Sequence, residues 1–283
     1  MNPAKLLLLT ALSLCAFAGN SVLCRIALKS GAIDAATFTL VRIAAGAAML
    51  TVLAFARRGV PANLHAGSWA GAFALSAYAV AFSFAYVRLD AATGALLLFG
   101  AVQLSLIGYA LVRGERASAF GTLGIALGIG GLVALLAPGA SAPPLTAALL
   151  MVAAGAAWAW YTVLGRRSGD ALNVTAGSFL RALPIAALAA LPLSGTMHAD
   201  AFGLAYAMAS GAITSGIGYT LWYLALPHLS TLTASTVQLC VPILAALAGV
   251  ALLGETLTLR LVAASIAVLG GIAIVAASNA RRG

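Results

Sequence analysis

Acidic residues are the first place to look for chemistry in this chain, because carboxylates bind protons, cations and metals. All six lie at the ends of long apolar stretches or between them: Asp34, Asp90, Glu115, Asp170, Asp200 and Glu255. Carriers driven by an ion gradient usually hold a carboxylate within such a stretch, at membrane depth. The apolar stretches also contain no His/Cys cluster, paired carboxylate or Ser-His-Asp set. We therefore expect no metal site, no cofactor and no enzymatic activity.

Two arginines do fall inside apolar stretches. Arg42 lies about eight residues into one stretch and Arg181 about ten into another, where an arginine costs roughly 2.5–3.5 kcal/mol on insertion scales. A substrate carboxylate is one group that could offset this cost. The alternative, which we favour because both halves of the chain carry the arginine, is contact with backbone carbonyls or snorkelling to the interface.

Glu115 and Glu255 form a repeated pair, since each follows a glycine and they stand 140 positions apart. A binding role is one interpretation. Each precedes an apolar stretch, however, and a negative side chain at a helix start is worth roughly 0.3–1 kcal/mol. We favour this structural role.

Polar and aromatic side chains recur at helical spacing within several stretches, so that each set lies on one helix face. Such faces point to a wet cavity or to neighbouring helices. Two aromatics near the ends of stretches, Tyr86 and Trp222, are expected in the interfacial belt. Nine residues are candidate substrate ligands, with interhelical packing as the alternative: Asn20, Tyr78, Phe82, Phe99, Gln103, Trp158, Tyr161, Tyr219 and Gln238.

The composition indicates what holds these residues in place. The chain is 63% hydrophobic and 7% charged, with a mean hydropathy of +1.08, which excludes a water-soluble globule. A bilayer span takes about 20 apolar residues. The charges and a Pro/Gly-rich break at 138–144 divide the chain into ten predicted spans: 5–29, 34–56, 66–86, 91–112, 118–137, 145–165, 171–193, 200–223, 231–252 and 258–279.

The net charge of +9 follows membrane topology and does not predict a nucleic-acid partner. With both termini cytoplasmic, most basic residues fall on the inner side, as the positive-inside rule requires. These are Lys5, Arg57, Arg58, Arg113, Arg116, Arg166, Arg167, Arg281 and Arg282; the outer side holds Arg25, Lys29, Arg88 and Arg260.

An internal repeat organises the spans. A shift of 140 residues places Gly114-Glu115 on Gly254-Glu255 and Gly130-Gly131 on Gly270-Gly271. Each unit has five spans, an odd number, so the second unit enters the membrane from the opposite side. We predict one domain over 1–283, with repeat one at 1–140 and repeat two at 141–283. Inverted repeats are typical of secondary transporters that bind substrate between the halves.

Several motifs resemble a known family. They are Gly19-Asn20-Ser21-Val22 with Arg25, the arginines 42 and 181, and the run from Ala225 through Pro242 and Gly254-Glu255 to Gly270-Gly271. Over essentially its whole length the chain resembles the ten-helix EamA-type exporters of the drug/metabolite transporter superfamily, with the YddG-like amino-acid exporters as the suggested subgroup. Phe17-Ala18 stands where a tryptophan is expected before the glycine, and Val102 where the second half has Pro242.

The resemblance implies efflux of small metabolites across the bacterial inner membrane. We expect an all-helical membrane protein of two inverted repeats that exports or exchanges neutral or aromatic amino acids by alternating access, without an ion-coupling carboxylate. Two alternatives stay open. One is a phosphorylated-metabolite or nucleotide-sugar exchanger that uses the two arginines; the other is a membrane scaffold without transport. The expected partners are a small-molecule substrate and the lipid bilayer, and the sequence leaves the oligomeric state open.

Overall fold

The computed structural model describes residues 1–57, 62–165, 170–229 and 231–280 of the protein. The arginines at 58, 166, 167, 281 and 282, which contribute to the predicted orientation, lie outside these residues. Within them the chain is helical except for loops and one isolated two-residue bridge. Eight helical segments are long and apolar enough to cross a membrane, and Cys240–Leu253 is a shorter apolar helix.

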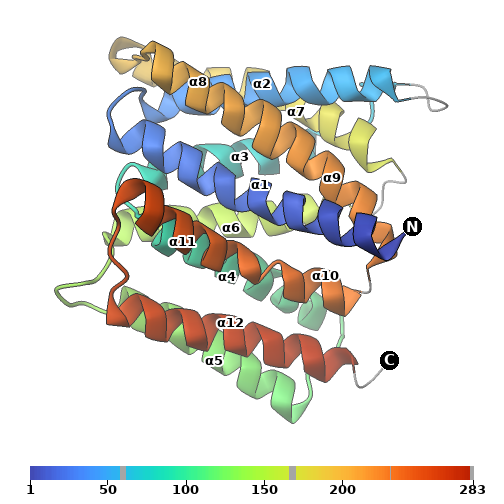
Figure 1. Ribbon diagram of the computed structural model, residues 1–283, viewed down its shortest axis with the longest axis vertical. Coiled ribbons are helices and arrows are strands. Elements are labelled where there is room, and N and C mark those ends of the chain that lie inside the picture. The colour runs from blue at the N-terminus through green and yellow to red at the C-terminus, as the bar shows by residue number, and fades with distance from the viewer. Residues whose placement is uncertain (58–61, 166–169, 230, 281–283) are drawn as a thin grey trace.

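The first half of the chain forms five antiparallel helices (Figure 1). They are α1 (Pro3–Lys29), α2 (Ala35–Ala56), α3 (Trp69–Tyr86), α4 (Ala91–Val112) and α5 (Ala119–Leu136).

The second half repeats this order with more interruptions. It contains α6 (Leu145–Gly165), α7 (Ala171–Ala190) with a 3-10 turn (Leu191–Thr196), α8 (Ala201–Ala209), a π-helical segment (Ser210–Ile217), α9 (Gly218–Ala225), a 3-10 turn (Leu226–His228), α10 (Thr231–Val237), α11 (Cys240–Leu253) and α12 (Leu259–Ala280). We count α8 to α9 as one span and α10 to α11 as another, so the expected all-helical architecture of ten spans is confirmed.

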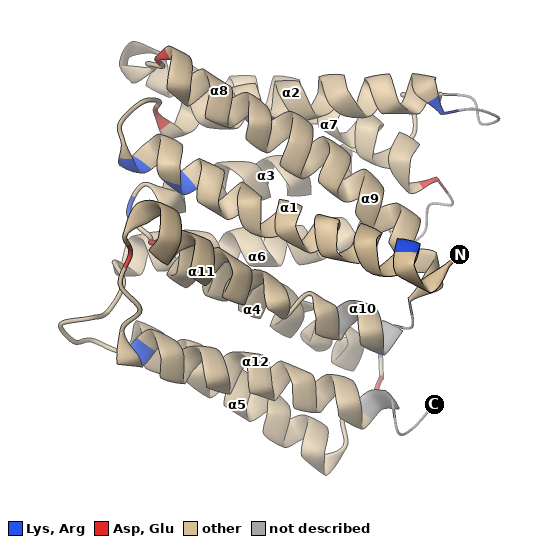
Figure 2. Ribbon diagram, in the orientation of Figure 1, with Lys and Arg blue, Asp and Glu red and all other residues tan. Residues whose placement is uncertain are grey.

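The start of α1 and the end of α12 lie on the same side of the molecule (Figure 1). We call the side where α1 begins and α12 ends the inner end, following the predicted orientation, and the opposite side the outer end. Charged residues of the described chain gather at these two ends, and the helix middles between them are largely uncharged (Figure 2).

Helix contacts follow the exchange expected of two inverted units. The pair α3 and α6 has its counterpart in α1 against α8, the π segment and α9, and the pair α4 and α6 in α1 and α11. Likewise α3 and α7 correspond to α2 against α8 and the π segment. The remaining large contacts, α5 with α12, α2 with α7 and α4 with α11, join equivalent helices. A two-fold exchange of the halves leaves this set of contacts unchanged.

The repeated Gly-Glu dipeptide marks the ends of equivalent helices. Gly114 ends α4 with φ +94° and Gly254 ends α11 with φ +62°, a left-handed conformation that glycine adopts without steric cost. The following amides return to the helices, Glu115 N to the Ala110 carbonyl and Glu255 N to the Gly249 carbonyl, each at 3.1 Å. Helix termination therefore accounts for the repeated glycine.

Helices α5 and α12 pack closely at one edge of the molecule (Figure 1). A Cβ atom on Gly124 would lie 2.5 Å from the carbonyl oxygen of Gly271, so the two backbones approach as small residues allow. The glycine-rich run in α5 is therefore a packing surface, as its sequence predicts.

Two interruptions in the second half lie beside the centre of the molecule. The π segment inserts a wide turn between α8 and α9, and π turns are frequent at functional sites. The span after it breaks between Val237 and Cys240. Pro242 provides the reason: it has no N–H to bond the carbonyl of residue 238, which instead accepts from Val241 N at 3.0 Å.

Candidate functional site

A cavity of about 570 Å³ lies between the two halves, lined by residues of α1, α3, α4, α6, α7, the π segment, α9, α10 and the connections next to them. At one end its lining includes Gly165, Ala171, Leu226 and Leu229, which stand at or beyond helix termini at the inner end. At its other end the lining stops at mid-helix residues, among them Asn20 and Tyr78. The cavity therefore reaches the inner end and is closed toward the outer end.

Aromatic rings form much of the cavity wall. Trp158 of α6 lies at the centre, with ring centroids 4.8 Å from Tyr78, 5.1 Å from Tyr219 and 5.4 Å from Tyr161. Phe17 of α1 closes the group against Tyr219 at 5.8 Å. Rings from both halves thus meet around one space, which an apolar or cationic group can occupy.

Eight of the nine predicted site residues line this cavity: Asn20, Tyr78, Phe99, Gln103, Trp158, Tyr161, Tyr219 and Gln238. Among the described residues, the side-chain amides of Gln103 and Gln238 have no hydrogen-bond partner. They are available to a bound molecule. The ninth, Phe82, is fully buried behind the wall, 5.4 Å from the Tyr78 ring.

The expectation that Tyr86 and Trp222 belong to the interfacial belt is wrong. Tyr86 is fully buried, with its ring 4.7 Å from Phe82 and its hydroxyl donating to the Ala91 carbonyl at 3.4 Å. Trp222 is 7% exposed and lines the cavity. Position near a helix end predicted lipid contact, but in this fold the ends of α3 and α9 face other helices.

A polar network crosses from the first half to the second at the closed end of the cavity. Asn20 of α1 accepts a hydrogen bond on Oδ1 from the Ser210 hydroxyl at 2.7 Å, and Thr214 Oγ1 lies 3.3 Å from the same oxygen. The Asn20 Nδ2 group donates to the Tyr78 hydroxyl at 3.2 Å. The π segment positions Ser210 and Thr214 for these contacts.

Arg42 adjoins this network from behind. It is 2% exposed, and its Nη2 donates to the Tyr78 hydroxyl at 2.9 Å. The guanidinium carbon lies 5.0 Å from the Tyr78 ring centre and 4.7 Å from that of Phe82. Among the described residues its Nη1 has no hydrogen-bond partner and no carboxylate pairs with it.

Arg181 has a different environment, and it fits the structural interpretation. Its Nη1 donates to the carbonyls of Ala66 and Gly177, both at 2.9 Å, and its Nη2 to the His65 carbonyl at 2.9 Å. The expectation of backbone carbonyl partners is confirmed for Arg181 and wrong for Arg42. Local sequence is similar at the two positions, so the neighbouring elements decide the difference.

Sequence analysis missed several parts of the site. The π segment gives no periodic signal; its Gly211 is packed against the Arg42 carbonyl, where a Cβ would clash. Many of the other lining residues have ordinary apolar or small side chains, so their type did not distinguish them; Trp222 was instead expected in the interfacial belt. The remaining lining residues are Phe17, Leu98, Val102, Leu106, Thr162, Gly165, Ala171, Val174, Thr175, Thr214, Trp222, Tyr223, Leu226, Leu229 and Ala234.

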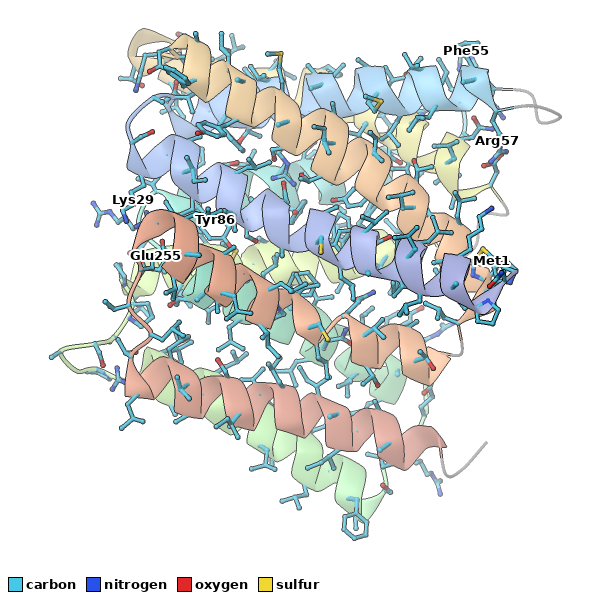
Figure 3. All side chains as sticks on the ribbon, viewed as in Figure 1. Met1, Lys29, Phe55, Arg57, Tyr86 and Glu255 are labelled. Atoms are coloured by element: carbon cyan, nitrogen blue, oxygen red, sulfur yellow. The ribbon has the colours of Figure 1, made fainter. Side chains whose placement is uncertain are left out.

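An ionic cluster closes the outer end. Arg25 donates through Nε to Glu255 at 3.2 Å and through Nη2 to Asp90 at 3.2 Å. Its Nη1 donates to the carbonyls of Tyr86 at 3.0 Å and Val87 at 3.1 Å. Figure 3 shows Tyr86 and Glu255 near the outer end and Arg57 at the inner end. The cluster joins α1, the α3–α4 connection and the α11–α12 connection.

Glu255 was expected to lie at the start of its own helix, but the structure places it elsewhere. Its carboxylate accepts from the Ala91 amide at 2.8 Å and therefore caps α4, across the boundary between the halves. Burial raises the pKa of Glu255 above its ordinary value, against the lowering effects of the Ala91 amide and Arg25. Its repeat equivalent Glu115 is exposed and precedes α5 by several residues.

At the inner end α2 and α7 are tied together. Arg57 donates through Nη1 to Asp170 at 3.1 Å. Burial opposes ionisation of Asp170, but the hydrogen bonds from Arg57 and Asn173 outweigh it and hold the pKa of this carboxyl below its usual value. Neither Arg57 nor Asp170 is among the residues that line the cavity, although α7 begins beside its inner end.

A bundle of apolar helices around a central cavity, with halves related by exchange, defines a multi-pass membrane protein of the transporter class. Comparison with known proteins indicates the family of transporters. Residues 145–277 match the EamA-like transporter family. The second half of the chain thus belongs to this family, and the match supports the EamA type within the drug/metabolite transporter superfamily.

Relatives of two kinds are found. A Pseudomonas aeruginosa protein named "Uncharacterized protein PA1977" is 56% identical over 100% of this chain and 98% of its own length. The threonine/homoserine exporter RhtA of Salmonella typhimurium is 36% identical over 47% of this chain and 44% of its own length. RhtA of Escherichia coli is 39% identical over 40% of this chain and 39% of its own length. The RhtA matches thus span less than half of either protein.

One solved structure shares the fold. A crystal structure described only as "Crystal structure of protein" aligns with a TM-score of 0.67 at 22% identity, over 96% of this chain and 97% of the other. At this level of identity the likeness concerns the fold alone.

Proposed function

We propose that this protein is a secondary transporter of the bacterial inner membrane, with both termini cytoplasmic, that exports or exchanges small neutral or aromatic amino acids by alternating access. The observation that carries the proposal is the cavity between the two halves, which reaches the inner end and is closed at the outer end. An inward-facing cavity takes its substrate from the cytoplasm. Reversal of the two arrangements would release it on the other side.

The cavity wall supports an amino acid as the substrate. Its described lining combines aromatic rings with uncharged amides and hydroxyls and contains no Asp, Glu, Lys or Arg. A neutral zwitterion fits such a wall, because rings attract an ammonium group and amides bind either of its charged ends. The partial match to threonine/homoserine exporters points to the same substrate class.

The energy source we propose is the gradient of the substrate itself. Coupling to protons or sodium needs a titrating or ion-binding group on the pathway. Glu255 is the buried acid of the described chain, and it lies at the outer end in contact with Arg25, away from the cavity lining. The alternative of a phosphorylated-metabolite exchanger needs both arginines for anions, and the contacts of Arg181 with three carbonyls oppose it.

Counterflow into proteoliposomes tests this function. Vesicles loaded with unlabelled threonine, homoserine or phenylalanine are expected to accumulate the labelled amino acid, and the rate should persist after a protonophore dissipates the proton gradient. Val174→Trp, which fills the cavity, should abolish accumulation. Flux of sugar phosphates without amino acids would overturn the substrate class. Flux that stops with the protonophore would overturn the uncoupled mechanism, and no flux of any solute would favour a scaffold.

A further inference from the structure

We infer that the closed end of the cavity is a carboxylate subsite, in which the Tyr78 hydroxyl donates to the substrate and Arg42 orients that hydroxyl and supplies the positive charge. This inference rests on the proposed function and names the group that the site recognises. Arg42 is a positioning residue here, since Tyr78 lines the cavity and Arg42 stands behind it.

The first step is the state of Arg42. A buried guanidinium is normally paired with a carboxylate or fully hydrogen-bonded, because removing its charge from water is costly. Here Nη1 has no partner among the described residues, and the contacts that do exist are two ring faces and one hydroxyl. These leave the positive charge largely uncompensated, a few ångströms behind the cavity wall. An anion in the cavity would complete the pair.

The second step is the direction of the Tyr78 hydroxyl. Its oxygen accepts from Asn20 Nδ2 at 3.2 Å and from Arg42 Nη2 at 2.9 Å. Both neighbours are donors, so neither can accept the hydroxyl proton. Within the described part of the chain no other acceptor bonds it. The proton is therefore free for an acceptor in the cavity. Because Arg42 is a cation, the hydrogen bond that it donates to the Tyr78 hydroxyl strengthens the hydrogen bond that this hydroxyl donates to the acceptor.

The third step fixes the orientation of the Asn20 amide. Ser210 donates to its Oδ1 at 2.7 Å, which assigns the oxygen to the π segment and the NH₂ group to Tyr78. The Asn20 oxygen is thus occupied and turned away from Tyr78. Through this arrangement the second half holds Tyr78, which belongs to the first half, in the donating orientation.

The chemistry selects a single carboxylate. One guanidinium behind one donor provides a single positive charge, which matches a monoanion, whereas a phosphate dianion would lack a second cation among the described lining residues. An ammonium group is repelled at this end by Arg42. The ammonium and side chain of an amino acid are thereby directed toward the rings of Trp158 and Tyr219.

The test compares acids with their amides in the full-length protein. Calorimetry on purified protein measures the Kd of threonine against threoninamide and of phenylalanine against phenylalaninamide. We expect each acid to bind at least about tenfold more tightly than its amide, because the acid offers a charged hydrogen-bond partner. Tyr78→Phe and Arg42→Gln should bring the ratio close to one. Because the ratio is taken within one variant, a reduced folded fraction does not change it.

Arg181→Gln is the matched control, since it removes the equivalent arginine of the second half, which contacts carbonyls outside the cavity lining. It should keep the wild-type ratio. Equal binding of acid and amide by the wild type, or a Tyr78→Phe variant that keeps the preference, would overturn the inference.

Failure of the proposed function is distinguishable. If no amino acid or amide binds, that function fails, and the same comparison is made with 3-phenylpropionate and 3-phenylpropanamide. Selective binding of the acid, lost in Tyr78→Phe, would support the carboxylate subsite on its own. Binding of neither compound, or of both equally, would overturn it.

Discussion

At the scale of residues, identical side chains at equivalent positions do different work. Arg42 meets two rings and a hydroxyl, whereas Arg181 meets three backbone carbonyls. Glu255 is buried in an ionic cluster, whereas Glu115 is exposed. A repeat therefore conserves the position of a side chain in the fold, and its surroundings then determine its role.

Asn20 provides a test at this scale, because its amide bridges the Tyr78 hydroxyl and the π segment. Asn20→Asp would place a carboxylate about where Nδ2 lies, 3.2 Å from the Tyr78 hydroxyl. That carboxylate would accept the hydroxyl proton and pair with Arg42, so it competes with the carboxylate of the substrate. We expect threonine binding to weaken roughly tenfold and the acid-to-amide ratio to fall, while the thermal unfolding temperature is kept or raised.

Calorimetry and thermal unfolding of the same Asn20→Asp preparation check both parts. Asn20→Ser, which keeps a neutral group, serves as the comparison. Wild-type affinity for threonine in the aspartate variant would contradict the expected competition.

At the scale of elements, the caps and breaks place the site. Asp170 caps α7 through the amide of Asn173 at 3.3 Å and also binds Arg57 at the end of α2. The π segment and the break before Cys240 bring polar groups of the second half to the centre. Equivalent spans of the first half, α3 and α4, are continuous, so the two halves contribute unequal surfaces to the cavity.

The Asp170 tie predicts a pH dependence of stability. Its pKa is lowered below the ordinary 3.8 in the folded protein, so the stabilisation is fully present above that ordinary value and is lost as pH falls through the folded pKa. Asp170→Asn keeps a capping side chain and removes the charge. Thermal unfolding is measured from roughly pH 2.5 to pH 7, a range that includes the ordinary pKa of an aspartate. At the upper end of this range the wild type should be more stable than Asp170→Asn by about 0.5–1 kcal/mol.

That difference should vanish at the acidic end. Arg57→Gln added to Asp170→Asn should have no further effect, because the pair is already broken. A difference independent of pH would show that the side chain acts through shape and not through charge.

At the scale of the whole molecule, the cavity reaches the inner end, and the ionic cluster joins the helices at the outer end. Arg25 and Glu255 join opposite halves, and Glu255 also caps α4. These contacts must separate when the outer end opens. Their equivalents around Glu115 lie at the inner end, where that side chain is exposed. This is the difference expected between the closed and the open end of a transporter that alternates between inward-open and outward-open arrangements.

Glu255→Ala should therefore shift the protein toward the outward-open arrangement. In a background without native cysteines, Leu98→Cys places one thiol in the cavity. We expect a membrane-impermeant maleimide to label it from the inner side in the parent protein, and from the outer side about tenfold faster once Glu255→Ala weakens closure by roughly 1.4 kcal/mol. Glu115→Ala is the matched control and should leave outer labelling unchanged. Equal outer labelling in the Glu255→Ala and Glu115→Ala proteins would contradict a closing role.

Span positions, charge distribution and the repeat were readable from sequence because each depends on local composition. Apolar length predicts a membrane helix, and the helical spacing of polar and aromatic residues within one span predicts which of its faces points away from the lipid. The same argument failed for Tyr86 and Trp222. A position near the end of a span does not distinguish a side chain buried against other helices from one in the interfacial belt. It also placed Phe82 in the cavity wall, although it lies behind Tyr78.

The sequence by itself determined the ten-span helical architecture and the resemblance to its family, and eight of its nine candidate site residues line the cavity. Only the tertiary structure decided that Arg42 lies behind Tyr78 with no carboxylate partner among the described residues, that Glu255 caps α4, and that the cavity reaches the inner end. The physical reason is range. Hydropathy and charge act within one helix, whereas partner atoms for a buried charge come from helices distant in sequence, and packing alone determines which of them arrive.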